Sequence, residues 1–361
     1  MSVEETGSNE ILSGDVKSKK AYYTWAGALI FSISFTFIIW ALGPLLESFE
    51  LGIDQGASWY YWKLPTREFM TMLIVWSFYL AHQFSIWGSI YWAQKNLIEY
   101  KTKPTSSLTK YNWATLLINA VFIVLHLVQT HIWFDGLAQD VPIFTSQGSV
   151  IIMLVLILVM ENPRRGIFMG RKAGKPITAQ VSGFFRRNHQ YIIAWALVYT
   201  FWFHPMASDP QLVTGFFYMF LLFTQVSLAY TVVHVNRGWV VLLESFVGVH
   251  ALVVAVYNTL QHESANMWVM FASGFAFMFV FTYIYVFKVR KEIRWIAALT
   301  YIGALVWIYL PNSLGGYYDR DLTDLMRLEF LWIPIILYLL AYVFAGIVYI
   351  FLERRNTTES L

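Results

Sequence analysis

The sequence contains no cysteine among its 361 residues. This absence excludes disulfides, thiolate nucleophiles, iron–sulfur clusters and zinc sites built from thiolates. Any bound metal ion must therefore be held by histidine, carboxylate or methionine side chains. Charged residues are also scarce, because they make up 13% of the chain, whereas soluble domains carry about 25%. No phosphate-binding glycine loop, nucleophile elbow or lysine within a predicted helix interior is present.

What the sequence has in abundance is apolar surface, since 58% of its residues are hydrophobic and 19% are aromatic. Apolar runs of about 20 residues recur along the chain, and each can cross about 30 Å of hydrocarbon as a helix. The sequence therefore predicts an all-α, polytopic membrane bundle of about ten transmembrane helices. They form one domain (21–352) between an N-terminal tail (1–20) and a C-terminal tail (353–361). The predicted helices are 21–46, 69–94, 112–134, 144–161, 190–206, 212–235, 238–258, 267–288, 294–311 and 330–352.

The basic residues predict the orientation of this bundle. With a cytoplasmic N-terminus, only Lys63, Arg67, Arg320 and Arg327 of the 25 lysines and arginines fall in outer loops. The positive-inside rule therefore predicts that both termini are cytoplasmic. The longest cytoplasmic loop, 162–189, is basic and separates the first four helices from the last six.

The first 16 residues lack the hydrophobic region and cleavage site of a signal peptide, so the first helix is expected to act as the insertion signal. We expect the protein in the cytoplasmic (inner) membrane of a bacterium or archaeon. Its expected partners are lipid and, depending on its function, a quinone, a small apolar substrate or further membrane subunits. We expect no nucleic-acid partner.

Ionisable side chains inside a membrane are costly and are functional candidates by default. The interiors of the predicted helices contain no lysine or arginine and one acid, Glu244. Glu244 has three interpretations: a catalytic or proton-relay acid, a partner that orients His250, or a neutral carboxylic acid bonded within the bundle. Burial favours the neutral acid in each of them.

Histidines are the other ionisable residues of the predicted helices. His189 and His234 are predicted at the cytoplasmic face, and His204 and His250 at the outer face. The 15 residues from His189 to His204 keep both near one helical face, about 22 Å apart along the axis. Membrane b-type cytochromes hold two stacked haems with histidine pairs of this kind. We therefore predict that His189 with His234, and His204 with His250, bind haem b.

The segment HLVQTHIWFD offers a rival metal site. His131 and Asp135 are four residues apart and share a helical face, and His126 precedes them by a little more than one turn. Imidazole and carboxylate ligands suit copper, iron or zinc. The sequence thus predicts a second candidate site, made of His126, His131 and Asp135, at the outer surface.

These candidates define the functions to test. The leading expectation is a membrane oxidoreductase that transfers electrons to or from quinone, or oxidises a small apolar substrate. The alternatives are a carrier or channel for a neutral or weakly polar solute, with Glu244 in its path, and a structural subunit of a membrane complex. An outer acidic cluster, Asp319, Asp321 and Asp324, could bind a hard cation such as calcium.

Overall fold

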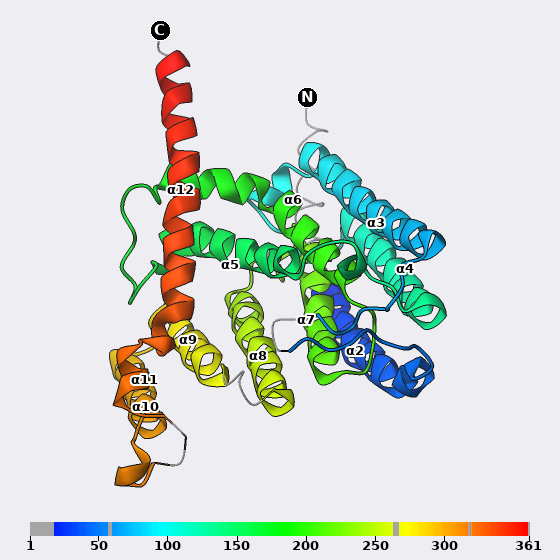
Figure 1. Cartoon of the computed structure of the whole chain (residues 1–361). Helices are drawn as coiled ribbons and strands as arrows, with labels where there is room; N and C mark the ends of the chain where they lie inside the picture. The colour runs from blue at the N-terminus through cyan, green and yellow to red at the C-terminus, as the bar shows by residue number, and fades with distance from the viewer. Residues whose placement is uncertain (1–17, 57–59, 263–266, 317, 319, 360–361) are drawn as a thin grey trace, which may run out of the picture. The chain divides into compact units, whose positions relative to one another are not determined.

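A computed structural model describes residues 18–56, 60–262, 267–316, 318 and 320–359 (Figure 1). Within these ranges the chain is helical and contains no strand, only two isolated bridges. Each predicted helix has a counterpart. The long helices are α2 (Lys20–Leu42), α3 (Phe69–Asn96), α4 (Lys110–Trp133), α5 (Ile143–Arg165), α6 (Ala179–Phe203), α7 (Pro210–Ser227), α8 (Arg237–Gln261), α9 (Trp268–Phe281), α10 (Lys291–Ile308) and α12 (Trp332–Glu359). Most of the predicted N-terminal tail lies outside the described residues.

Seven of the described helices are long and apolar enough to cross a membrane. They are α2, α3, α4, α5, α8, α9 and α12, with adjoining 3-10 turns counted in three cases. The fold is therefore a helical bundle with the composition of an integral membrane protein. The other three long helices are α6, which contains Arg186 and Arg187, α7, and α10, which begins with Lys291, Glu292 and Ile293 before Arg294.

The chain packs as two compact units, each of which is described by itself. The first comprises Met1–Ser149 with Gln190–Leu243, and the second comprises Val150–His189 with Glu244–Leu361. Helices α5, α6 and α8 contribute residues to both units. The single transmembrane domain expected over residues 21–352 stays a prediction.

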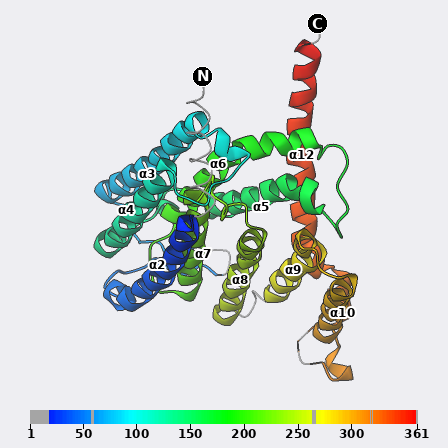
Figure 2. The same ribbon diagram turned by 180° about the vertical axis from the view of Figure 1, so that it is seen from behind.

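In the first unit, α3 packs against α4, and α7 packs against both α2 and α4 (Figures 1 and 2). The aromatic end of α6 fills the space among these helices, since Phe201, Trp202 and Phe203 are fully buried. The rings of Phe201 and Phe216 of α7 meet edge to face, with centroids 5.9 Å apart. Each such side chain buries about 150–250 Å², so this aromatic run fixes the positions of the polar residues beside it.

In the second unit, α9 contacts α10 and α12 (Figure 1). Two glycines allow α9 to approach its neighbours closely. A Cβ atom on Gly248 of α8 would lie 2.7 Å from Cβ of Phe275, and one on Gly274 would lie 2.7 Å from Cβ of Ile333 of α12. Small residues at helix crossings are typical of membrane bundles, where association depends on close packing rather than on the hydrophobic effect.

Helix α5 continues four residues beyond the predicted end at 161, to Arg165. Pro163 lacks an N–H group and leaves the carbonyl of Val159 without its helical partner. The hydroxyl of Ser182 donates to Val159 O at 2.8 Å and replaces the missing bond. The supporting helix, α6, itself begins at Ala179 rather than at 190, so the connection is only 166–178. Residues 162–165 and 179–189 of the predicted loop 162–189 are thus helical, because α5 continues past the compensated proline and α6 begins earlier than predicted.

Helix α7 ends at Ser227, although the apolar pattern predicted a helix to 235. Side chain and backbone groups from elsewhere take over its last hydrogen bonds. Asn112 donates to Ser227 O at 2.7 Å and to Ala229 O at 2.8 Å. The backbone N–H of Thr105 donates to the carbonyl of Tyr230, and the carbonyl of Thr105 accepts from the N–H of Val232. These competing partners draw the segment out of the helix.

Candidate functional site

Arg165 of α5 and Glu244 of α8 form a buried ion pair in the second unit. Their side chains are 1% and 2% exposed. Nη2 of Arg165 donates to Oε1 of Glu244 at 2.9 Å, and Nη1 donates to Oε2. This two-pronged arrangement is the strongest geometry available to a guanidinium and a carboxylate. None of the three interpretations of Glu244 from the sequence included a cationic partner, because Arg165 was assigned to a loop.

The ring of Tyr283 contacts Arg165, and the hydroxyl of Thr282 holds the chain that follows it. Its guanidinium carbon lies 4.8 Å from the centroid of the Tyr283 ring, a distance at which the ring face attracts a cation. The hydroxyl of Thr282, next to Tyr283, donates to Ile167 O at 2.9 Å and lies 2.7 Å from the hydroxyl of Tyr338. The chain just after Arg165 is thereby tied to the end of α9.

Two buried polar atoms of this region have no hydrogen-bond partner in the described structure, Arg165 Nε and Ser245 Oγ. Oε2 of Glu161 also makes no hydrogen bond of good geometry, but Nε of Arg164 lies 3.2 Å from it. Glu161 lies one helical turn before Arg165 on α5, and Ser245 follows Glu244 on α8. Buried polar groups without a protein partner usually meet water or a ligand. Arg165 Nε offers a donor, and the hydroxyl of Ser245 can act as donor or acceptor.

The charges of this cluster cancel. Arg164 forms an ion pair with Glu161 at 3.2 Å, in addition to the pair of Arg165 with Glu244. We refer to these four residues and Ser245 as the α5–α8 cluster. Two arginines balance two glutamates, so the cluster carries no net charge that would attract an ion of either sign. It can receive a neutral group that donates and accepts hydrogen bonds.

The first unit contains a second polar centre, along α4. Asn112, Asn119 and His126 recur every seven residues, close to two turns, and so lie on one face of the helix. All three side chains are buried. Asn119 Nδ2 donates to the hydroxyl of Ser227 at 2.9 Å, and Asn112 donates to the carbonyl of the same residue. The polar face of α4 is therefore paired with the end of α7.

His82 of α3 continues this network. Its Nε2 faces Oδ1 of Asn119 at 2.9 Å, and Nε1 of Trp202 donates to its Nδ1 at 3.2 Å. An indole N–H can only donate, so Nδ1 of His82 accepts and Nε2 carries the proton that Asn119 accepts. The neutral ring of His82 thus satisfies both contacts.

His126 of α4 lies on the other side of Trp202, with ring centroids 4.3 Å apart. Its Nε2 faces the carbonyl of His204 at 2.8 Å, and its Nδ1 faces Oε1 of Gln129 at 3.1 Å. His204 in turn places its Nδ1 3.0 Å from the hydroxyl of Tyr60. Burial raises the pKa of Tyr60 well above its ordinary value, so Tyr60 stays a protonated phenol.

Arg67, which precedes α3, joins the loops at one end of the first unit. Its guanidinium pairs with Asp135 and also with Asp140, to which Nε donates at 2.7 Å and Nη2 at 2.6 Å. Burial opposes ionisation of Asp140, but hydrogen bonds from Arg67 and from Trp76 hold the pKa of Asp140 below its ordinary value. We call Arg67, Asp135 and Asp140 the carboxylate clamp.

The predicted metal ligands His126, His131 and Asp135 are engaged separately. Asp135 pairs with Arg67, and His131 Nδ1 lies 2.8 Å from the carbonyl of Leu127. Among the residues that the structure describes, no three histidine or acidic side chains gather closely enough to hold a metal ion. The copper, iron or zinc site stays a prediction from the sequence.

The four predicted haem ligands are divided between the units. His204 and His234 belong to the first, and His189 and His250 belong to the second. All four are half-buried, and Nδ1 of His234 lies 2.9 Å from the carbonyl of Gln225. Each predicted pair combines one histidine from each unit. The haem, quinone and electron-transfer functions therefore stay predictions.

The described acids of the outer cluster have a structural role. Asp321 accepts from the backbone N–H groups of Thr323 and Asp324 at the start of α11 (Leu322–Met326), and Asp324 pairs with Arg327 at 3.3 Å. These backbone hydrogen bonds lower the pKa of Asp321. Asp319 lies outside the described residues.

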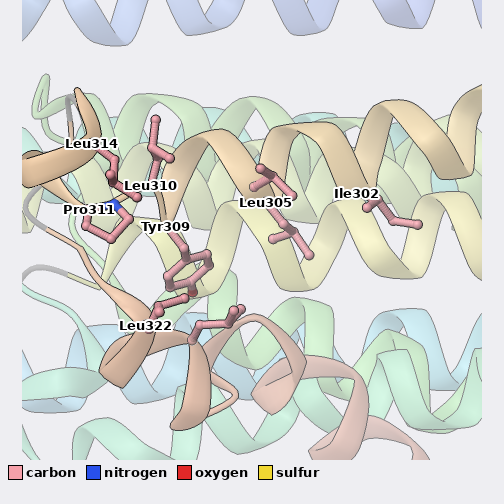
Figure 3. A pocket seen from close by; sticks show the side chains of 9 residues that line it. Ile302, Leu305, Tyr309, Leu310, Pro311, Leu314 and Leu322 are labelled. Atoms are coloured by element: carbon pink, nitrogen blue, oxygen red, sulfur yellow. The ribbon is translucent and has the colours of Figure 1, made fainter.

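A pocket of about 380 Å³ lies between the end of α10 and α11 in the second unit (Figure 3). Its only polar side chain is Tyr309, whose hydroxyl donates to Oε1 of Glu329 at 2.8 Å. A lining of this kind suits a hydrocarbon chain and supplies no reactive group. The lining residues are Ile302, Leu305, Val306, Tyr309, Leu310, Pro311, Leu314, Leu322 and Leu325.

The sequence identified Glu244 but missed its partner. Arg165 stands four residues after a predicted helix end, in a basic segment typical of a cytoplasmic loop. The polar face of α4 did leave a signal, because Asn112 and Asn119 precede His126 at exact multiples of seven residues. No sequence pattern indicated the ion pairs of Arg67, because Asp135 and Asp140 lie in loops far from it in the sequence.

No known protein family, curated protein or solved structure matches this sequence. The function is therefore inferred from the geometry of the two centres.

Proposed function

We propose that the protein is a membrane carrier for a small neutral solute that both donates and accepts hydrogen bonds. The observation that carries this proposal is the α5–α8 cluster, a charge-balanced group of side chains around a buried ion pair in which Arg165 Nε and Ser245 Oγ have no hydrogen-bond partner in the described structure. In this proposal the solute occupies those atoms during transport, and Arg165 and Glu244 separate and re-form their pair around it.

The energetic cost of the ion pair supports a functional role. Removing two charges from water costs several kcal/mol per ion, which their mutual attraction only partly repays. Packed apolar residues would stabilise a bundle of this kind as well or better. A charged pair kept at the membrane-spanning helices α5 and α8 is therefore a candidate for binding or movement.

The balance of charge supports a neutral solute. The two arginines and two glutamates of the α5–α8 cluster cancel, so an ion would be left without a counter-charge. A neutral polyol or amide can bond to Arg165 Nε and Ser245 Oγ without changing that balance.

The proposal includes a topology with ten spans and both termini in the cytoplasm of a bacterium or archaeon. Helices α6, α7 and α10 would then cross the membrane together with the seven apolar helices. The small number of lysines and arginines in the proposed outer loops supports this arrangement. The α5–α8 cluster would lie toward the cytoplasmic side, at the end of α5 and about 10 Å from the start of α8.

Solute flux into proteoliposomes tests the proposal. Stopped-flow light scattering would follow the entry of glycerol, urea and a panel of further neutral polyols and amides. We expect at least one probe to enter faster than into protein-free vesicles. Glu244→Gln and Arg165→Gln should each slow that entry by at least about tenfold, which corresponds to about 1.4 kcal/mol.

Two further variants separate function from folding. Arg320→Gln breaks another ion pair of the second unit, Arg320 with Glu329 at 3.0 Å, and should leave flux unchanged. The double variant Arg165→Gln with Glu244→Gln restores charge balance and should fold, but it should not transport. Vesicles that admit no probe faster than the protein-free control, or a Glu244→Gln variant with full flux, would contradict the proposal.

A further inference from the structure

Two connections of the second unit lie side by side, although they are far apart in the sequence. Residues 166–178 join α5 to α6, and a shorter segment joins the end of α9 to α10. The N–H of Met169 donates to the carbonyl of Phe281 at 2.7 Å, and the hydroxyl of Thr282 donates to the carbonyl of Ile167 at 2.9 Å. These hydrogen bonds hold the first connection against the end of α9.

Both connections begin at the same membrane–water interface. The segments before them, Ile143–Arg165 and Trp268–Val286, are each long and apolar enough to cross a membrane. Because the two segments end beside each other, they end on the same side of the membrane, whichever side that is. The connections that follow, 166–178 and 287–290, therefore lie at the depth of the lipid headgroups.

These connections and the first turn of α10 are strongly basic. Apart from Lys175, they contain six basic residues and one acid, Glu292. Lys175 already has partners, since its ammonium lies 5.6 Å from the centroid of the Tyr349 ring and interacts with the carboxylate of Glu353. Five of the six basic side chains are exposed, and one is half-buried. We call the six residues the basic patch: Arg171, Lys172, Lys288, Arg290, Lys291 and Arg294.

Tyr285 brings the two parts of the basic patch together. Gly170 has a φ of +77°, which glycine adopts easily, and a Cβ atom on it would lie 3.0 Å from Cδ1 of Tyr285. The guanidinium carbon of Arg294 lies 4.5 Å from the centroid of the same ring. Arg171, which follows Gly170, and Arg294 are therefore held at one aromatic side chain. A surface that concentrates charge of one sign in this way attracts an ion of the opposite sign.

Arg294, the half-buried member of the patch, has a hydrogen-bond donor to offer. Its Nη2 donates to the carbonyl of Phe287 at 3.1 Å, whereas its Nε has no hydrogen-bond partner in the described structure. A guanidinium has five N–H donors, and two of them can bond to one phosphate group at the same time. Arg164 and Arg165, at the end of α5, are instead paired with glutamates. The basic patch is thus the part of this interface whose charge is not balanced.

We propose that the basic patch binds the headgroup of an anionic phospholipid of the surrounding bilayer. Its position favours a lipid over a soluble anion, because the patch follows directly on two apolar segments. Exposed apolar side chains also flank Arg294 on α10, namely Ile293, Trp295 and Ile296. They can pack against the lipid chains while the phosphate meets the arginine. Clusters of lysine and arginine beside membrane-spanning helices are typical sites for such headgroups. The site is independent of the proposed transport function, because it involves neither Glu244 nor Ser245.

Native mass spectrometry of the full-length protein, released from detergent micelles, tests the inference by counting bound lipids. The probes are phosphatidylglycerol and phosphatidylcholine with the same acyl chains, so that they differ in the net charge of the headgroup. We expect the wild type to bind the first phosphatidylglycerol at least about tenfold more tightly than phosphatidylcholine. Equal affinity for the two lipids would overturn the proposal.

A variant without most of the patch should lose this preference. It carries Lys288→Gln, Arg290→Gln, Lys291→Gln and Arg294→Gln. A version that keeps Arg294 and changes only the three exposed lysines and arginine should lose part of the preference, and it removes no contact that the structure shows. This second variant keeps the test independent of whether the loss of Arg294 disturbs folding.

A matched control removes the same number of positive charges from the first unit, at exposed lysines in and after α3 and at the start of α4. It carries Lys95→Gln, Lys101→Gln, Lys103→Gln and Lys110→Gln. We expect this control to keep the wild-type preference for phosphatidylglycerol. An equal loss in both variants would contradict a defined site and would show a general effect of net charge. Displacement of the lipid by excess inorganic phosphate, but not by chloride of the same ionic strength, would overturn the assignment to a lipid in favour of a soluble phosphate.

Discussion

Glu244→Gln should destabilise the protein more than Arg165→Gln, although the two changes remove the same ion pair. Arg165 cannot lose its proton, so Glu244→Gln leaves a fixed positive charge that is 1% exposed. Breaking a buried pair in this way costs about 3–5 kcal/mol. The new amide still offers one acceptor oxygen, so we expect a value near the lower limit.

Arg165→Gln should cost less, because the remaining charge can be neutralised. When Arg165 is replaced by glutamine, Glu244 can take up a proton and become neutral, which limits the cost of its burial. We expect about 1–3 kcal/mol, the cost of an unsatisfied buried group. This cost should fall as the pH is lowered, because protonation of Glu244 becomes easier. The cost of Glu244→Gln should not depend on pH in this way.

A double variant measures the stability of the protein without either charge. Arg165→Met with Glu244→Leu removes both charges and fills their space with apolar atoms, so its stability should lie within about 1 kcal/mol of the wild type or above it. Unfolding by sodium dodecyl sulfate in mixed micelles, followed by the fluorescence of the 16 tryptophans, measures all these variants. Arg320→Gln is the control, since a partly exposed pair is worth about 0–1 kcal/mol.

Two results would contradict a paired, buried Arg165 and Glu244. One is a double variant whose loss of stability equals the sum of the single losses, because independent sites add and paired charges do not. The other is an equal, pH-independent cost for Glu244→Gln and Arg165→Gln.

Three further predictions concern the fold around the two centres. Asp140 has a lowered pKa in the folded state, so its pairing with Arg67 stabilises the protein at a pH above about 4, the ordinary carboxyl pKa. This stabilisation is lost as the pH falls through the lower pKa of the folded state. Asp140→Asn should reduce the acid sensitivity of unfolding, and an unchanged pH profile would contradict this. Ser182→Ala leaves Val159 O buried without a partner, and we expect a loss of about 1–3 kcal/mol in the same unfolding assay. Asn112→Ala removes two hydrogen bonds to the end of α7, worth about 1 kcal/mol each, and hydrogen exchange should become faster after Ser227.

The helices could be predicted from the sequence because their signal is local. An apolar run of about 20 residues specifies a membrane-spanning helix without reference to its neighbours. The start of α3 at Phe69 and the end of α4 at Trp133 accordingly lie within a residue of their predicted positions. Helix ends fixed by tertiary contacts were not predictable. Pro163 normally stops a helix, and only the hydroxyl of Ser182, from the next helix, allows α5 to continue.

The sequence indicated which face of α4 is polar, but not the hydrogen-bond partners of its side chains. Repetition every seven residues marked the face of α4 that holds Asn119 and His126, since that spacing is a property of one helix. The sequence could not show that His82 would be neutral in its contacts and His126 surrounded by acceptors. That difference depends on Trp202 and on the carbonyls at the end of α6, which come from a helix about 70–120 residues away in the chain.

The sequence places no arginine in the interiors of the predicted helices, whereas the structure places Arg165 within α5. Four additional residues in α5 move Arg165 from a predicted loop to the buried face of a helix. Glu244 then changes from an isolated acid, for which burial favours the neutral form, to one half of a charge-balanced pair. A solitary acid suggests proton transfer, whereas a balanced pair with unfilled donors and acceptors beside it suggests binding of a neutral solute. The proposed function thus depends on whether α5 ends before or after Pro163, and Ser182→Ala tests it: if α5 requires this hydroxyl to continue, solute flux should fall together with stability.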